Sequence, residues 1–219
     1  MPDIIFAGPD GRLEGRYHPG AQPNSPLALV LHPHPLYGGN MNNKIVYTLF
    51  HVYARFGFAV LRFNFRGVGR SQGVFDHGQG ELSDAASAMD WLQTHNPNAR
   101  NCWIAGYSFG GWIAMQLLMR RPEIAGFVAV APPANMFDFN FLAPCPSSGL
   151  VVQGLEDQIV PEPDVAKLVH RLSNQRDIKI EYRKVPGATH FFENKLDVLT
   201  NLVERHLRHA LSEAPSAAA

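Results

Sequence analysis

Short apolar runs alternate with longer amphipathic segments along most of this chain. The apolar runs predict buried strands, at residues 27–31, 58–65, 101–105, 126–130, 150–152 and 178–185. Apolar residues at helical spacing predict helices between them, at residues 42–56, 82–94, 112–119, 165–172 and 196–211. Because strands that alternate with helices usually form parallel sheets, the pattern predicts an α/β fold with helices on both faces of a mostly parallel sheet.

The two ends of the chain depart from this alternation. Residues 4–6 and 13–17 are strand-like and are joined across Gly8-Pro9-Asp10-Gly11, which predicts an N-terminal antiparallel hairpin. The last residues, 212–219, are expected to form a disordered tail. We therefore expect a single domain over residues 1–211, which is long enough for one well-buried core.

Composition and charge limit the partners that this domain is expected to have. The chain is 46% hydrophobic, and its 19 basic residues balance its 19 acidic ones. This balance gives no reason to expect nucleic acid or an anionic membrane as a partner, so a small molecule is the expected one. The sequence leaves the oligomeric state open, with a homodimer as one possibility.

The N-terminus and the cysteines indicate the compartment. The N-terminus has neither the basic region nor the apolar length of a signal peptide, and no apolar stretch reaches the roughly 18 residues of a membrane helix. Two cysteines, Cys102 and Cys145, are too few for a disulfide framework. We therefore expect a cytoplasmic protein.

The segment Gly106-Tyr107-Ser108-Phe109-Gly110 lies between a predicted strand and a predicted helix. In that position, Gly-x-Ser-x-Gly is the pattern of a nucleophile elbow, a tight turn that exposes a serine hydroxyl. Glycine suits the flanking positions because the turn leaves little room for a side chain. Ser108 is therefore the candidate nucleophile.

A serine nucleophile needs a base, and the base needs an acid that orients it. Asp157 follows the predicted strand 150–152, and His190 follows the predicted strand 178–185. Because ligands bind beyond the carboxyl ends of parallel strands, these side chains are expected to meet Ser108, in the chain order of α/β-hydrolases. Taken singly, the aspartate could be a helix cap and the histidine structural, and Glu156 is a rival acid.

Acyl transfer also requires N–H donors for the developing oxyanion. The backbone N–H of Phe109, the residue after the nucleophile, is one expected donor. The other is expected from the His-Pro-His-Pro loop, in which Pro33 and Pro35 have no N–H. The first free amide beyond this string is that of Leu36, which is the preferred donor, with His34 as the alternative.

Several side chains near these positions have roles that the residues alone leave open. His32 and His34 could hold a metal ion, but two histidines without a third nearby ligand make a weak site, so neither metal nor cofactor is expected. Tyr37, Tyr107 and Phe191 adjoin the candidate residues and are expected to bind substrate as pocket walls. The aromatic-rich segment before the strand 150–152 either packs on the core or lines the pocket, and it is too short for a cap domain.

Taken together, these motifs resemble those of bacterial α/β-hydrolases. The matching segments are Leu31-His-Pro-His-Pro-Leu-Tyr-Gly-Gly39, residues 62–71, the elbow, the Asp157 loop and Pro186-Gly-Ala-Thr-His190. The chain is similar to the small dienelactone-hydrolase-like branch whose members carry the HPHP loop, and the resemblance covers residues 27–206. It implies an α/β-hydrolase fold, with Ser108, Asp157 and His190 as nucleophile, acid and base.

Dienelactone hydrolases carry cysteine at the elbow, whereas this chain carries Ser108. An ordinary serine esterase mechanism is therefore expected, with cleavage of small carboxylic esters through an acyl-enzyme. Thioester or peptide hydrolysis would use the same residues. A non-catalytic binding protein with this fold is the alternative from another class.

Overall fold

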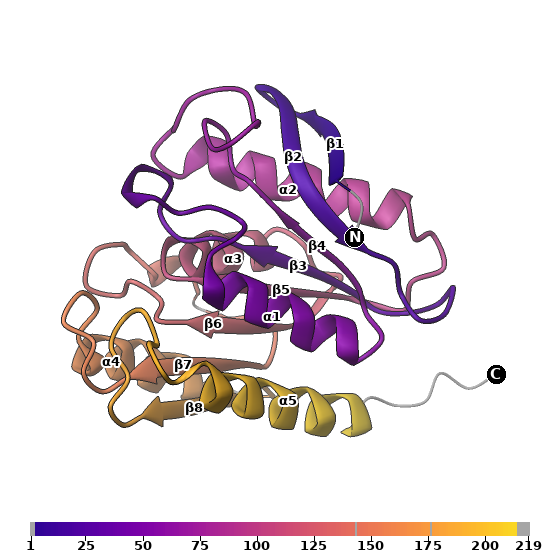
Figure 1. Ribbon diagram of the computed structural model, residues 1–219. Helices are drawn as coiled ribbons and strands as arrows, with labels where there is room; N and C mark the ends of the chain where they lie inside the picture. Colours follow the sequence, from indigo (N-terminus) through magenta and orange to yellow (C-terminus); the bar gives the residue numbers. More distant parts are fainter. Residues whose placement is uncertain (1–2, 143, 176, 214–219) are drawn as a thin grey trace.

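A sheet of eight strands forms the centre of the part of the chain described by the computed structural model, residues 3–142, 144–175 and 177–213 (Figure 1). The strands are β1 (Asp3–Gly8), β2 (Gly11–His18), β3 (Leu27–Leu31), β4 (Ala59–Phe63), β5 (Cys102–Tyr107), β6 (Ile124–Val130), β7 (Gly149–Gly154) and β8 (Ile180–Val185). The strands from β3 to β8 are parallel, and the β1–β2 hairpin joins them antiparallel through the pairing of β2 with β4. The predicted mostly parallel sheet and N-terminal hairpin are confirmed.

Helices cover both faces of the sheet. They are α1 (Lys44–Arg55), α2 (Gln79–Thr94), α3 (Phe109–Leu118), α4 (Glu162–Ser173) and α5 (Leu196–Glu213). Figure 1 shows α1 and α5 in front of the sheet and the other three behind it, and each group has its own hydrophobic core. Between β6 and β7 the described residues form only the short 3-10 turn η2 (Asn140–Leu142), so the chain has no cap domain, as predicted.

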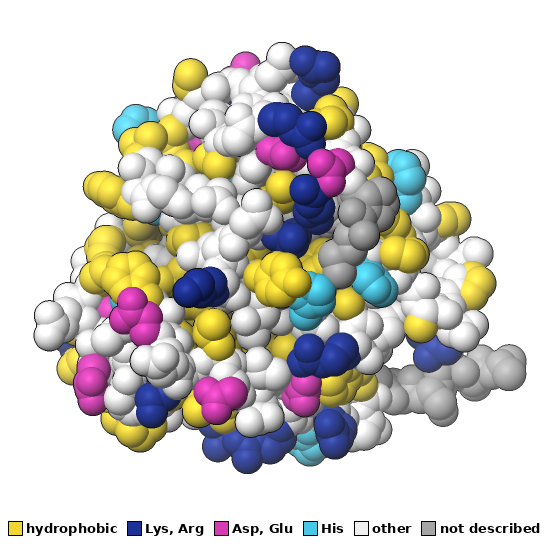
Figure 2. Space-filling model, in the orientation of Figure 1, with side chains coloured by type: hydrophobic (Ala, Val, Ile, Leu, Met, Phe, Trp, Pro, Cys, Tyr) yellow, Lys and Arg dark blue, Asp and Glu magenta, His cyan; other side chains and the backbone are white. Residues whose placement is uncertain are grey.

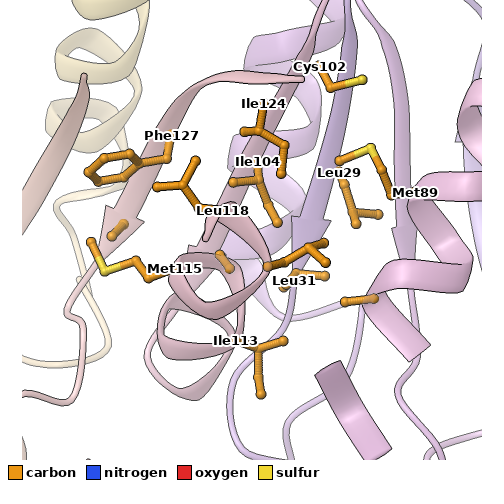
Figure 3. Packing of buried hydrophobic residues seen from close by; sticks show 14 of the residues in the cluster. Leu29, Leu31, Met89, Cys102, Ile104, Ile113, Met115, Leu118, Ile124 and Phe127 are labelled. Atoms are coloured by element: carbon orange, nitrogen blue, oxygen red, sulfur yellow. The ribbon is translucent and has the colours of Figure 1, made fainter. Parts of the chain in front are cut away.

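Burial on both faces explains why the strands are continuously apolar. In β3, Leu29 and Leu31 pack towards α2 and α3, whereas Ala28 and Val30 pack towards α1 and α5. Figure 3 shows the first of these two layers, in which the β3 leucines lie close to Ile104 of β5. Successive strand residues point to opposite faces, so a strand covered on both sides needs apolar residues at every position.

The order of the strands places the candidate site. Along the sheet the order is β1-β2-β4-β3-β5-β6-β7-β8, so the chain leaves β3 in one direction to β4 and returns to pair β5 on the other side. The carboxyl ends of β3 and β5 therefore meet where the chain changes direction, the position at which open α/β sheets bind ligands. The loop after β3 and the turn after β5 are the two that carry the predicted oxyanion donors.

The helices begin or end up to three residues from their predicted bounds. Helix α2 begins at Gln79, before the predicted start, because the Glu81 side chain accepts hydrogen bonds from the N–H groups of Asp76 and Gly78 and caps it. Helix α5 continues to Glu213, and the rest of the expected tail, residues 214–219, lies outside the described residues. None of the described helices combines the length and the apolar character that crossing a membrane requires.

Candidate active site

Ser108 lies in the turn between β5 and α3 with φ 52° and ψ −121°. A non-glycine residue in this region costs about 1–3 kcal/mol and persists only where the surroundings hold it. Its N–H donates to the Val130 carbonyl of β6 at 2.9 Å, and its carbonyl accepts from the Gly111 N–H at 2.8 Å. A Cβ on Gly106 would lie against the backbone of Gly110, so the turn requires glycine there.

A chain of hydrogen bonds leads from this serine to a buried carboxylate. The Ser108 Oγ lies 3.2 Å from the His190 Nε2, and the His190 Nδ1 lies 2.8 Å from the Asp157 Oδ2. The carboxylate accepts the Nδ1–H, which leaves the Nε2 to accept the serine proton. The structure thus brings together the three residues that the chain order predicted. Glu156 is exposed, and the His190 Nδ1 is engaged by Asp157 instead.

The surroundings of Asp157 keep its carboxyl group ionised. Burial opposes its charge, but the hydrogen bond from His190 and those from backbone and side-chain donors outweigh burial and hold its pKa below the usual value. The backbone donors are the N–H groups of Ile159 and Val160, at 2.9 and 2.8 Å from the Asp157 Oδ1. The side-chain donor is the Gln153 Nε2, at 3.1 Å from the Oδ2.

Tyr107 forms a hydrogen bond with the backbone of the histidine. Its side chain is buried, and its hydroxyl donates to the backbone carbonyl of His190 at 2.9 Å. Burial is also the main reason why the pKa of its hydroxyl is raised, so the group remains a donor. Tyr107 therefore has two positions to explain. It lines the cavity, as the sequence predicted, and it also holds the backbone of the loop that carries His190.

The loop after β3 does not present Leu36 as expected. The Leu36 N–H donates to the Nδ1 of the His34 ring at 3.2 Å, within the short turn η1 (Pro35–Tyr37), and Leu36 is not among the residues that line the cavity. His34 does line it, and among the described residues its N–H has no hydrogen-bond partner. Because the loop uses the leucine amide internally, the geometry favours His34, the alternative donor, over Leu36.

Phe109, the other expected donor, is the first residue of α3. The first N–H groups of a helix have no partner inside the helix, and within the described part of the chain that of Phe109 has none elsewhere. The two residues with unpaired amides, His34 and Phe109, thus both line the cavity beside Ser108.

His32 has a structural role. Its Nδ1 donates to the Pro33 carbonyl at 2.6 Å, and its Nε2 accepts the Phe65 N–H at 3.0 Å, which ties the loop after β3 to the loop after β4. Burial lowers its pKa to about 4, so the ring is neutral at pH 7. With both ring nitrogens engaged, His32 cannot form the metal pair with His34 that its spacing allowed.

A cavity of about 530 Å³ opens beside Ser108. The three side chains expected as pocket walls, Tyr37, Tyr107 and Phe191, all line it. Further lining residues include Met136, Phe137 and Ile159. Met136 and Phe137 belong to the aromatic-rich segment, which the sequence predicted either to line the pocket or to pack on the core. Ile159 was not predicted as a pocket residue.

Comparison with known proteins identifies the family. The sequence model of the X-Pro dipeptidyl-peptidase (S15) family matches residues 15–144, more than half of the chain, and this match includes Ser108. The chain belongs to this family of α/β hydrolases. The matched region ends before Asp157 and His190, so these two residues lie outside it.

Full-length relatives agree with this assignment. The hydrolase is 56% identical over 211 residues to an uncharacterised protein of Rickettsia prowazekii. The aligned region covers 94% of this chain and 89% of the relative. It is 57% identical to a solved protein of unknown function from Agrobacterium tumefaciens, a candidate α/β hydrolase, with a TM-score of 0.95 over 97% of this chain and 98% of that one.

A more distant solved structure bears on the missing cap. An α/β serine hydrolase without a lid from Xanthomonas campestris is 31% identical, with a TM-score of 0.85 over 95% of this chain and 94% of that one. Its lidless architecture matches the short connection between β6 and β7 in this hydrolase. Among the described residues, no cap domain therefore covers the cavity beside Ser108.

Proposed function

We propose that this hydrolase cleaves small carboxylic esters through an acyl-enzyme on Ser108. One observation carries the proposal: the Ser108 Oγ, His190 and an ionised Asp157 form a continuous chain of hydrogen bonds at the wall of an open cavity. Serine becomes nucleophilic at neutral pH when a histidine can accept its proton and a carboxylate stabilises the resulting imidazolium.

The reaction proceeds in two steps. In the first, the Ser108 Oγ bonds to the acyl carbon while the His190 Nε2 takes the serine proton, and this proton then passes to the alkoxide as the ester C–O bond breaks. In the second, water gives a proton to His190 and attacks the acyl-enzyme, which releases the acid and returns the proton to Ser108. Each step passes through an oxyanion next to the start of α3.

The backbone N–H groups of Phe109 and His34 are the proposed oxyanion donors. Their unpaired state supports this role, because a donor already engaged elsewhere, such as the Leu36 amide, would have to break a hydrogen bond first. A single oxyanion donor contributes about 3–4 kcal/mol to transition-state stabilisation in serine hydrolases. The HPHP loop that supplies one donor also supports the dienelactone-hydrolase-like branch as the subgroup within this proposal.

Replacement of the nucleophile tests the proposal. We expect Ser108→Ala to lower 4-nitrophenyl acetate turnover by about 10⁴-fold or more, because no other group can form the acyl-enzyme. The matched control is Ser83→Ala, an exposed serine of α2, which should retain the wild-type rate. Equal rates for Ser108→Ala and wild type would refute the proposal.

A fluorophosphonate probe separates an enzyme from a binding protein of the same fold. We expect covalent labelling of the folded wild type and no labelling of Ser108→Ala, detected by intact-protein mass spectrometry. Folded wild-type protein that stays unlabelled and hydrolyses no ester would instead identify a non-catalytic member of the family.

Peptide hydrolysis is the second candidate, because the matched family is named for X-Pro dipeptidyl-peptidase activity. An amide would be cleaved through the same acyl-enzyme, with His190 protonating the leaving amine. Release of 4-nitroaniline from Gly-Pro-4-nitroanilide, dependent on Ser108 and faster than ester hydrolysis at equal substrate concentration, would favour this candidate over the esterase.

A further inference from the structure

Exposed apolar side chains surround the mouth of the Ser108 cavity. Tyr37, Met136, Ile159 and Phe191 line the cavity with exposed fractions of 86%, 53%, 42% and 56%. They come from the loops after β3, β6, β7 and β8, so four separate loops each contribute one large apolar residue. Figure 2 shows hydrophobic side chains gathered on the left of the view, the side to which the parallel strands point in Figure 1. Convergent exposed apolar residues of this kind mark binding surfaces.

Deeper in the cavity, the apolar wall is held in place by ring contacts. Phe137 stacks on Trp112 with 4.3 Å between ring centroids, and Phe109 packs against both. The indole N–H of Trp112 donates to the Asp138 carbonyl at 3.0 Å, which fixes the ring against the loop that carries Phe137. The wall is therefore preorganised and does not need to form when substrate binds.

Three polar side chains of the cavity wall each form a hydrogen bond with the protein itself. The Asn43 Oδ1 accepts the Ile45 N–H at 2.9 Å, and the Tyr107 hydroxyl donates to His190. The His34 Nδ1 accepts the Leu36 N–H, and burial lowers the pKa of the ring, which favours its neutral form. The surface that the cavity presents to a ligand is therefore mostly apolar, although the Tyr37 hydroxyl and the Asn43 amide nitrogen also line it.

We infer that this hydrolase selects esters whose acyl group is uncharged, apolar and larger than acetyl, and that this group occupies the cavity bordered by Tyr37, Met136, Ile159 and Phe191. The inference rests on the proposed esterase function. An apolar acyl chain covers the exposed rim and removes both surfaces from water, which stabilises the complex. A charged acyl terminus loses its hydration there against aromatic and aliphatic side chains.

A matched set of substrates tests the inference on the wild-type enzyme. The 4-nitrophenyl hexanoate and the mono(4-nitrophenyl) ester of glutaric acid have acyl chains of similar length and differ in the terminal carboxylate, and 4-nitrophenyl acetate lacks the chain. We expect kcat/KM for the hexanoate to exceed that for each of the other two by at least about 10-fold, since a single methylene in an apolar pocket changes kcat/KM by about 10-fold or more.

A positive charge placed at Met136, on the rim of the cavity, provides a second test of the inference. Met136→Lys is expected to lower the hexanoate-to-glutarate ratio of kcat/KM by about 10-fold, because the ammonium attracts the glutarate carboxylate and interrupts the apolar rim. Val74→Lys is the matched control, because Val74 is an exposed apolar residue that does not line this cavity, and the ratio should keep its wild-type value.

Two results would overturn the inference. A Ser108-dependent enzyme that prefers acetate or the glutarate ester, or a ratio that Met136→Lys leaves unchanged, would contradict the substrate class while leaving the esterase function in place. If no ester of the set is hydrolysed in a Ser108-dependent manner, the proposed function fails and the substrate class fails with it.

Discussion

The Asp157 carboxylate has a donor that no sequence motif marks. Gln153 is fully buried at the carboxyl end of β7, and its Nε2 donates to the Asp157 Oδ2, the same oxygen that accepts from His190. The same nitrogen also donates to the Val160 carbonyl at 2.8 Å, which ties the amide to the loop that carries the aspartate. Gln153 does not touch the reacting atoms, so its expected role is to position Asp157.

Substitution of Gln153 separates this role from a structural one. We expect Gln153→Leu to lower kcat for 4-nitrophenyl acetate by about 10-fold or more with little change in KM, because a hydrogen bond to a charged group contributes about 1.5–3 kcal/mol. The pKa of Asp157 should also rise, because its ionised form loses a donor, and a carboxyl titration followed by NMR measures this direction.

The same change at an exposed site serves as the control for Gln153. Gln79→Leu, on the surface of α2, should leave kcat and the pKa of Asp157 at wild-type values. Gln153→His, which keeps a ring N–H donor, should recover part of the activity. A Gln153→Leu enzyme with wild-type kcat, or with a change in KM alone, would show that the amide does not position the aspartate.

Helix α3 combines the nucleophile turn with the start of a helix. Its first residue, Phe109, follows Ser108 directly, so the positive end of the helix dipole and an unpaired N–H lie next to the serine at which the proposed oxyanion would form. This arrangement requires α3 to approach β3 closely. A Cβ on Gly110 would lie 2.5 Å from the carbonyl oxygens of Leu31 and His32, which are backbone atoms that cannot move aside easily.

Two adjacent glycines of α3 therefore respond differently to the same change. We expect Gly110→Ala to lower the free energy of unfolding by about 2 kcal/mol or more, because the helix must move away from β3. Gly111→Ala should change it by less than about 1 kcal/mol, since its Cβ would meet the nearest atom, the Gly106 carbonyl oxygen, at 3.3 Å and alanine favours a helix. Urea denaturation measures both, and equal effects would contradict the close approach.

Across the molecule, the loops at the carboxyl edge of the sheet are joined by buried polar contacts as well as by the two hydrophobic cores. His32 is the central example, because its ring links the loop after β3 to Phe65 after β4 while it is fully buried and neutral. A buried neutral histidine makes the stability of the whole domain depend on pH.

Acidification is therefore expected to destabilise the fold through His32. Its pKa is about 4 in the folded protein, whereas the ordinary value, which applies to the unfolded chain, is 6.5. Between pH 4 and pH 6.5 the unfolded chain therefore binds a proton at this residue that the folded chain does not. The free energy of unfolding should consequently fall as the pH drops from 6.5 towards 4, with a contribution from this residue on the order of 1 kcal/mol per pH unit.

Urea unfolding at pH 7 and pH 5 measures this dependence. Protein with His32→Gln should show a smaller difference between the two pH values, because glutamine can accept the Phe65 N–H without titrating. His170→Gln, at an exposed histidine of α4, should keep the wild-type difference. An unchanged difference in His32→Gln would assign the pH dependence to other groups.

The sequence by itself determined the elements and the three residues of the hydrogen-bond chain. Periodicity reports local burial, so the apolar runs and amphipathic segments located the strands and helices, with deviations only at their ends. Ser108, Asp157 and His190 could be selected because each follows a parallel strand, and the carboxyl ends of such strands meet at one edge.

Tertiary structure alone decided the order of the strands, which amide of the loop after β3 stays unpaired, and the cavity wall. Strand order depends on pairing between segments far apart in the chain, which local patterns do not encode. The choice of His34 over Leu36 depends on a hydrogen bond inside the folded loop, which engages one amide and leaves the other free. Ile159 lines the cavity because four loops converge there, and only the folded chain brings them together.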